Sequence, residues 1–136
     1  MTTTGDPPPD EPLRRAPIQV RPSLLAGRGV FAVRDIKDGA LIEECPVIFI
    51  NAHGPELDDY IIRWGEEERD DDLLALPLGY GACYNHADDP NAYWDTDIER
   101  ALMIVYAARD IAANEEILIT YGSAWFSKRD WVAKKL

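Results

Sequence analysis

The chain has 136 residues, which is enough for one domain with a single modest core and too few for two. Its formal net charge of −11 disfavours nucleic acid as a direct partner, because phosphate binding needs a basic surface, and favours a basic protein or peptide. The longest apolar run, residues 101–108, is far too short to cross a membrane, and no export leader opens the chain, so we expect an intracellular protein, cytoplasmic or nuclear.

A proline-rich arm is predicted at the N-terminus. The first 17 residues, MTTTGDPPPDEPLRRAP, contain five prolines and very few apolar side chains. Such a segment cannot offset the conformational entropy that ordering would cost. We therefore expect residues 1–17 to be a disordered arm and residues 18–136 to form the folded domain.

Short β-type runs dominate the rest of the chain. Each run is bounded by Gly, Pro, Asp or Asn, which favour turns. The pattern is typical of a mostly β domain of small sheets. The predicted strands are 18–20, 30–33, 40–43, 47–50, 103–107 and 117–120.

Two short helices are also predicted. Four apolar residues recur at helical spacing and favour a helix from 57 to about 68. A second helix is expected after Gly122, where Ser123 can cap the segment AWFSKRDWVAKK. The four residues at helical spacing are Leu57, Tyr60, Ile61 and Trp64.

One internal repeat connects the two halves of the domain. The segment FAVRDIKDGALI, 31–42, aligns with YAARDIAANEEI, 106–117, at a uniform offset of 75 residues. Each copy reads as a strand, Arg-Asp-Ile, a residue suited to left-handed backbone, and a second strand. We expect two similar corners packed about a common core. The equivalent pairs are Ile36 with Ile111 and Gly39 with Asn114.

The cysteines and histidines argue against a metal centre. Cys45 and Cys83 form no CxxC motif, and the chain has only two histidines, His53 and His86. A zinc site is therefore not expected. A disulfide between the cysteines stays open, although reduced thiols are the rule in a chain that is not exported.

Acidic side chains gather in one segment. Residues 56–72 contain nine of them, against Arg63 and Arg69. The simpler interpretation is a solubilising face. The alternative is a docking surface for substrates rich in Lys and Arg.

Three motifs invite a functional interpretation. Gly27-Arg28-Gly29 lets the backbone approach a ligand closely, although in isolation a hairpin turn is the simpler interpretation. In CYNHADDPNAYW, 83–94, turn chemistry explains Asp-Pro-Asn but leaves the Asn-His pair unexplained. The structural interpretation is a buried turn with a core histidine. In ILITYGSAWF, 117–126, a strand delivers a tyrosine and two further aromatics, for which core packing is the simpler explanation.

Taken together and in this order, the motifs resemble those of SET domain protein methyltransferases. The order is GRGVFA, LIEE, YNHADDPN and NEEILITYG, and the resemblance covers about residues 18–126. The chain is most similar in build to the minimal single-domain SET enzymes of viral type. The resemblance implies a β-clip fold of small sheets in which the C-terminal segment threads beneath a loop as a pseudoknot.

The resemblance also implies a cofactor, S-adenosylmethionine, and a role for each motif. Asn85 would lie near the methionine portion of the cofactor, and His86 would contact adenine largely through its backbone. Asn91 and Pro90 would brace the knot, and Tyr121 matches the tyrosine regarded as catalytic. The remaining assignments are Gly27, Arg28 and Gly29 at the amino-acid end of the cofactor, Phe126 on adenine, and Tyr60, Tyr121 and Trp125 around the substrate lysine.

The function implied by the resemblance is an S-adenosylmethionine-dependent protein-lysine N-methyltransferase, a transferase of one-carbon groups. Its substrate would be a basic protein tail such as that of a histone in chromatin. Two alternatives stay open: a catalytically silent module of the same fold that binds basic partners, and a β-clip domain that binds another ligand. Small enzymes of this type can be dimers, and the sequence carries no interface signature that decides the matter.

Overall fold

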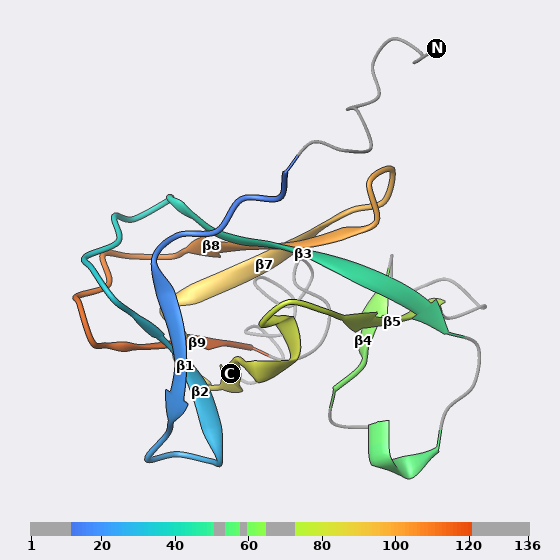
Figure 1. Ribbon diagram of the computed structural model, residues 1–136, viewed down its shortest axis with the longest axis horizontal. Coiled ribbons are helices and arrows are strands. Elements are labelled where there is room, and N and C mark those ends of the chain that lie inside the picture. Colours follow the sequence, from blue (N-terminus) through green and yellow to red (C-terminus); the bar gives the residue numbers. More distant parts are fainter. Residues whose placement is uncertain (1–11, 51–53, 58–59, 65–72, 121–136) are drawn as a thin grey trace, which may run out of the picture.

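Two small β-sheets make up the part of the chain that the computed structural model describes, residues 12–50, 54–57, 60–64 and 73–120 (Figure 1). This confirms the mostly β fold that the sequence predicts. The four-stranded sheet has the order β1-β2-β9-β6, formed by Ile18–Pro22, Arg28–Ala32, Glu116–Ile119 and Asn85–His86. The five-stranded sheet has the order β4-β5-β3-β8-β7, formed by Ile62–Trp64, Leu73–Pro77, Leu41–Ile50, Leu102–Ala107 and Ala92–Asp97. Single-turn 3-10 helices, η1 and η2, cover Pro55–Leu57 and Gly81–Cys83.

Strand β3 changes its main partner halfway along. Residues up to Pro46 pair with β8, and residues from Val47 onward pair with β5. The sequence predicts two separate strands here, 40–43 and 47–50, because Pro46 lacks the N–H that a ladder uses. One strand of ten residues forms instead, because neighbouring strands pair with both halves and the extended conformation continues across Pro46.

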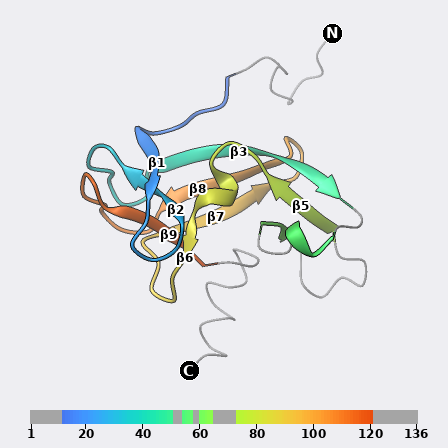
Figure 2. The ribbon, with the colours of Figure 1, turned by 60° about the horizontal axis from the view of Figure 1, so that its bottom comes forward.

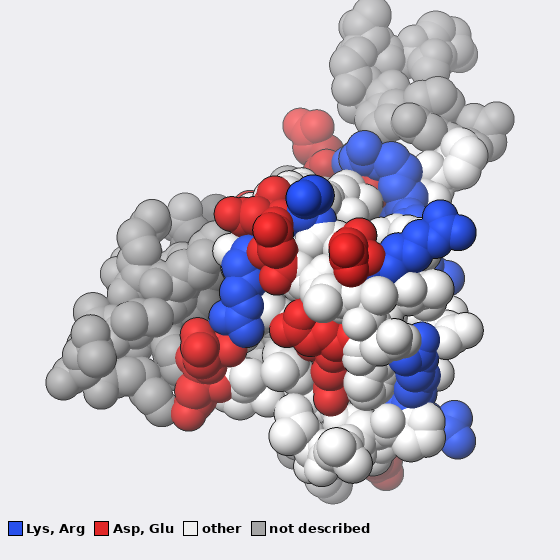
Figure 3. Space-filling view, turned by 90° about the vertical axis from the view of Figure 1, so that its left-hand side faces the viewer, with Lys and Arg blue, Asp and Glu red and all other residues white. Residues whose placement is uncertain are grey.

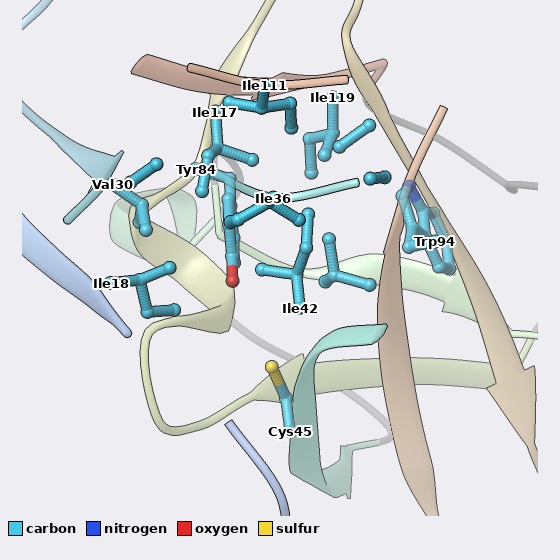
Figure 4. Packing of buried hydrophobic residues seen from close by; sticks show 14 of the residues in the cluster. Ile18, Val30, Ile36, Ile42, Cys45, Tyr84, Trp94, Ile111, Ile117 and Ile119 are labelled. Atoms are coloured by element: carbon cyan, nitrogen blue, oxygen red, sulfur yellow. The ribbon is translucent and has the colours of Figure 1, made fainter. Parts of the chain in front are cut away.

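The two predicted corners pack against each other as a pair. Ile36 and Ile111 exchange two backbone hydrogen bonds, N–H to C=O in each direction, at 2.8 Å. Both side chains are buried, and Figure 4 shows them within one cluster of core residues. The expectation that these isoleucines are equivalent plugs of a common core is confirmed.

The hydrogen bonds around the corners follow the same twofold pattern. Asp35 Oδ1 accepts from Ala113 N, and its equivalent Asp110 Oδ1 accepts from Asp38 N, both at 2.9 Å. Both residues at the predicted left-handed position have positive φ, 84° at Gly39 and 71° at Asn114. The repeat is therefore an approximate internal symmetry of the fold.

The core lies between the two sheets. Residues from β1, β2, β3, β7, β8 and β9 meet in one hydrophobic cluster with the two corner isoleucines. Figure 4 shows isoleucines from several strands gathered around the ring of Tyr84, which follows η2. Cys45 is buried at the edge of this cluster. Both cysteines are free.

The chain before β1 contributes to the fold more than the sequence suggests. The backbone of Arg14 to Ala16 hydrogen-bonds with Ile42 and Glu44 of β3. The side chains of Arg14 and Arg15 form ion pairs with Glu44 and Glu43 at 2.9 and 3.1 Å. Residues 14–16 therefore depart from the expected disordered arm, because two buried carboxylates require positive partners. Residues 1–11 lie outside the described part.

The helix predicted over 57–68 is wrong for the residues that the structure describes there. The chain makes only η1 and then extends into β4, which pairs with β5. Apolar spacing over four residues was compatible with a helix, but pairing with the next strand, β5, decided the outcome. The second predicted helix, after Gly122, lies outside the described residues. Among those residues, no helix is long and apolar enough to span a membrane.

Candidate functional site

The Gly27-Arg28-Gly29 motif forms the end of the β1–β2 hairpin. Ser23 N donates to Gly27 O at 2.8 Å, and Gly27 has φ of +44°, which a glycine adopts without strain. The simpler interpretation, a hairpin turn, is therefore confirmed as geometry. Arg28 is exposed and begins β2.

The turn lies directly against Asn85, 57 positions after Arg28 in the chain. Asn85 Nδ2 donates to Arg28 O at 3.0 Å and to Ala26 O at 3.2 Å. Gly29 is buried beneath this contact, and a Cβ at that position would overlap the Glu116 carboxylate and come within 2.9 Å of Asn85 Nδ2. The close approach therefore needs glycine, and the structure brings two of the three sequence motifs together.

Strand β9 holds the Asn-His pair in place. Asn85 and His86 form β6, which runs parallel to β9 opposite Leu118 and Ile119. In Figure 2, β6 and β9 lie beside the β1–β2 hairpin. The His86 side chain is exposed, with Nε2 3.2 Å from Asp88 Oδ1, so the interpretation of His86 as a core imidazole is wrong. The contact of its backbone with adenine stays a prediction.

Asn91 forms hydrogen bonds with the backbone of β9. It is 1% exposed, accepts from Leu118 N at 2.8 Å through Oδ1, and donates to Glu116 O at 2.9 Å through Nδ2. A buried amide that satisfies one N–H and one C=O of the same strand fixes the position of that strand. The role that the resemblance implies for Asn91 and Pro90, bracing the knot, stays a prediction, because the C-terminal segment lies outside the described residues.

The end of β9 is anchored next to the Asn-His pair. Trp94 Nε1 donates to Thr120 O at 3.0 Å, and Thr120 Oγ1 donates to Ala87 O at 3.3 Å. The predicted site residue Tyr121 is the next residue of the chain. Tyr121, Trp125 and Phe126 lie outside the described residues.

Tyr60 is the remaining predicted site residue, and no hydrogen bond among the described residues links it to the turn or the Asn-His pair. It is 48% exposed, and its N donates to Leu57 O at 2.9 Å. In Figures 1 and 2 the 3-10 helix η1 that precedes it lies at the other end of the molecule from the β1–β2 hairpin. Its assignment to a substrate slot stays a prediction.

Glu116 is a member of the site that the sequence analysis missed. Its Oε2 accepts from Asn85 Nδ2 and its Oε1 accepts from Ser23 Oγ, both at 2.8 Å. A signal was present in the repeat, because Glu116 stands where the first copy has Leu41. A carboxylate at a position that is apolar in the equivalent corner indicates a polar role.

The cysteines offer no nucleophile to the site. Burial raises the pKa of the Cys83 thiol, and the nearby Glu43 carboxylate raises it further. Burial likewise raises the pKa of Cys45. Because thiolate is the reactive form, burial disfavours nucleophilic chemistry at both cysteines.

Comparison with known proteins agrees with the motif order. The model of the SET domain family matches residues 27–122. A curated protein of Schizosaccharomyces pombe, named histone-lysine N-methyltransferase, H3 lysine-37 specific, is 35% identical over 123 residues, which is 85% of this chain and 80% of that protein.

Solved structures give the same result. A crystal structure from Plasmodium falciparum, provisionally named a histone methyltransferase, superposes with a TM-score of 0.67 at 37% identity, covering 83% of this chain and 99% of that one. A Chaetomium thermophilum Polycomb Repressive Complex 2 structure superposes with a TM-score of 0.65 at 20% identity, covering 79% of this chain and 15% of that one. At that identity the likeness is one of fold.

Proposed function

The chain belongs to the SET domain family of protein-lysine methyltransferases, and we propose that it transfers the methyl group of S-adenosylmethionine to a lysine of a basic protein tail. Histone H3 is the substrate to test first, because it is named in the S. pombe relative. If the substrate is a histone, the protein would act on chromatin, in the nucleus.

One observation carries the proposal. The glycine turn and Asn85 are far apart in the sequence, yet Asn85 Nδ2 reaches two carbonyls of the turn and Gly29 is buried at the contact. These are the two cofactor motifs that the family resemblance assigns to one ligand. Their contact supports a shared binding site.

The groups around the turn suit the cofactor by their chemistry. Ala26 O, Arg28 O and both Glu116 oxygens are acceptors that bind Asn85 Nδ2 or Ser23 Oγ, and the Glu116 carboxylate adds negative charge beside Asn85. Acceptors of this kind favour a cationic amine such as the ammonium of a methionine group. We assign Gly27, Arg28, Gly29 and Asn85 to the amino-acid end of the cofactor, and His86 and Phe126 to its adenine.

S-adenosylmethionine, when bound, supplies a methyl group on a positively charged sulfur. The protein must then align a neutral amine with that group, and alignment of two reactants can contribute on the order of 7–11 kcal/mol in favourable intramolecular cases. A free lysine has a pKa of about 10.4 and is mostly protonated at pH 7. A dry slot next to a positive charge lowers that pKa, because both disfavour the ammonium form.

The aromatic residues are assigned to that slot. Tyr60, Tyr121 and Trp125 would exclude water, surround the aliphatic stem of the lysine and tolerate methylated cations on their ring faces. Tyr121 is the proposed catalytic residue, since its hydroxyl can orient the amine. Its support is its place in the TYG motif, one residue after Thr120, which is anchored beside Ala87.

Transfer of a labelled methyl group tests the proposal. The full chain is incubated with labelled S-adenosylmethionine and histone H3, and mass spectrometry locates the label. We expect label on lysine with wild-type protein, little label with Tyr121→Phe, and little label with Asn85→Ala. Equal transfer by wild type and Tyr121→Phe would remove the catalytic role of Tyr121.

Calorimetry separates this function from a silent module that only binds basic partners. An enzyme of the proposed kind binds S-adenosylmethionine, and Asn85→Ala weakens the binding. A silent module ignores the cofactor and still binds an H3 tail peptide.

A further inference from the structure

We propose that Glu116 is the positioning residue of the cofactor site: it acts through Asn85, whose amide it orients, and ties that amide to the glycine turn. This inference rests on the proposed function, because it concerns the same cofactor. Glu116 lies within the NEEILITYG motif, but the sequence analysis assigned it no role.

The partners of Asn85 determine how its amide is oriented. Nδ2 lies within 2.8 Å of Glu116 Oε2, 3.0 Å of Arg28 O and 3.2 Å of Ala26 O. All three are acceptors, so the NH₂ end must face them. The hydrogen bond to Glu116 is the shortest of the three, and Glu116 is the only charged partner. It is therefore the strongest determinant of this orientation.

The orientation has a consequence for the opposite end of the amide. Oδ1 is bonded to the same carbon as Nδ2 and therefore points away from Glu116 and the turn. Among the described residues, no hydrogen-bond donor reaches Oδ1. Asn85 thus offers a preorganised acceptor, which suits the ammonium of the methionine portion of the cofactor.

Glu116 also holds the turn itself. Its second oxygen accepts from Ser23 Oγ at 2.8 Å, and the same Oγ accepts from Leu25 N at 3.0 Å. One carboxylate therefore connects the loop before Gly27 with Asn85. Because its strand, β9, pairs with both β2 and β6, Glu116 stands at the junction of the two cofactor motifs.

Binding measurements on Glu116 variants test the proposal without relying on turnover. Calorimetry with wild-type protein first establishes whether S-adenosylmethionine binds, and a failure there rejects the proposed function rather than this inference. If it binds, we expect Glu116→Ala to weaken binding by about tenfold to a hundredfold, the usual effect of losing a hydrogen bond to a charged group. Glu116→Gln should keep affinity within about threefold, because its oxygen can accept from Asn85 and its NH₂ can donate to Ser23 Oγ.

Two controls separate positioning from general damage. Methylthioadenosine lacks the amino-acid portion, so Glu116→Ala should bind it as wild type does, whereas a distorted pocket would bind both ligands poorly. Glu115→Ala and Glu115→Gln change the neighbouring residue, whose carboxylate accepts from Ala112 N and, at 3.3 Å, from Asn91 Nδ2. They should leave cofactor affinity unchanged, because Asn91 keeps its hydrogen bonds to Glu116 O and Leu118 N.

A double-mutant cycle gives the decisive result. If Glu116 acts through Asn85, adding Glu116→Ala to the Asn85→Ala variant should cause little further loss of cofactor affinity. Full additivity of the two losses, or a loss in Glu116→Gln as large as in Glu116→Ala, would overturn the positioning role.

Discussion

The buried carboxylate of Glu43 shows how single residues hold this small domain together. It is 1% exposed, and Oε1 accepts from Tyr84 Oη at 2.7 Å. Oε2 accepts from Tyr80 N at 3.0 Å and from the Arg15 guanidinium at 3.1 Å. A buried charge is tolerated only when partners replace its hydration, and each lost partner is therefore costly.

Removing the Tyr84 hydroxyl should destabilise the protein. Tyr84→Phe leaves Glu43 Oε1 without its buried donor, which typically costs about 1.5–3 kcal/mol for a bond to a charged group. The expected result is a lower urea midpoint at unchanged slope. Tyr80→Phe is the matched control, because the structure uses the backbone N of Tyr80 and not its hydroxyl to bind Glu43. Equal midpoints for wild type and Tyr84→Phe would refute the argument.

Glu44 should make stability depend on pH in the acid range. The hydrogen bond from the Arg14 side chain, with smaller charge effects of Arg14 and Arg100, holds the pKa of Glu44 below its ordinary value. A carboxyl with a depressed folded pKa contributes stability that is present above the unfolded pKa, about 4.3, and is lost as pH falls through the folded pKa. We expect the stability difference between wild type and Glu44→Gln, followed by urea unfolding, to shrink as the pH is lowered from 6 toward 3. A difference that stays constant over this range would contradict the prediction.

At the scale of elements, the paired corners require the same left-handed backbone conformation of two different residues. Gly39 and Asn114 both have positive φ, and a Cβ on Gly39 would meet nothing within 4 Å. Substitution of Gly39 therefore probes backbone strain without steric overlap.

Gly39→Ala should destabilise the protein by about 1–2 kcal/mol, the usual cost of left-handed backbone for an ordinary residue. Gly39→Asn should cost clearly less, because asparagine tolerates this conformation and occupies the equivalent place in the other corner. Thermal unfolding of wild type, Gly39→Ala and Gly39→Asn measures the order of their stabilities. If Gly39→Asn proves less stable than Gly39→Ala, the equivalence of the corners does not extend to their backbones.

The corners were predictable from the sequence because their signals are local. Arg-Asp-Ile followed by a left-handed residue specifies each turn within a few positions, and the 75-residue offset pairs them. Strands β4 to β7 were missed, although β4 pairs with β5 and β7 with β8 within short stretches of the chain. Strand β4 was assigned to a helix on its apolar spacing, and β6 is only two residues long. In β7 the buried Ala92 and Trp94 alternate with more exposed neighbours, but this period of two is hidden within a motif rich in turn residues.

At the scale of the whole molecule, the site depends on the position of one strand. Strand β9 lies between β2 and β6 and pairs with both, so it holds the glycine turn and the Asn-His pair in one sheet. The motif residues could be predicted from the family resemblance, which supplies contacts between distant segments. Glu116 has only one such signal, its difference from Leu41 in the repeat, and Ser23 has none, because a hydrogen bond across 93 positions leaves no periodic trace in the sequence.

Acidic residues are distributed unevenly along the chain. Figure 3 shows one end of the molecule, where acidic and basic side chains are interspersed. The excess of acidic residues in the sequence is concentrated instead in residues 56–72, most of which lie outside the described part. Their proposed role as a docking surface therefore has to be tested in solution.

If the acidic segment attracts basic substrates, salt should affect the two ligands differently. Charges on the protein raise the encounter rate with an oppositely charged peptide over distances comparable to the screening length, about 10 Å at 0.1 M salt and about 3 Å at 1 M. We expect kcat/KM for a basic H3 peptide to fall steeply between 0.05 and 0.5 M salt, while the calorimetric affinity for S-adenosylmethionine changes much less. A variant with Asp70, Asp71 and Asp72 replaced by Asn should lose part of the salt dependence. Equal salt sensitivity for peptide turnover and cofactor binding would mean that the acidic residues serve solubility alone.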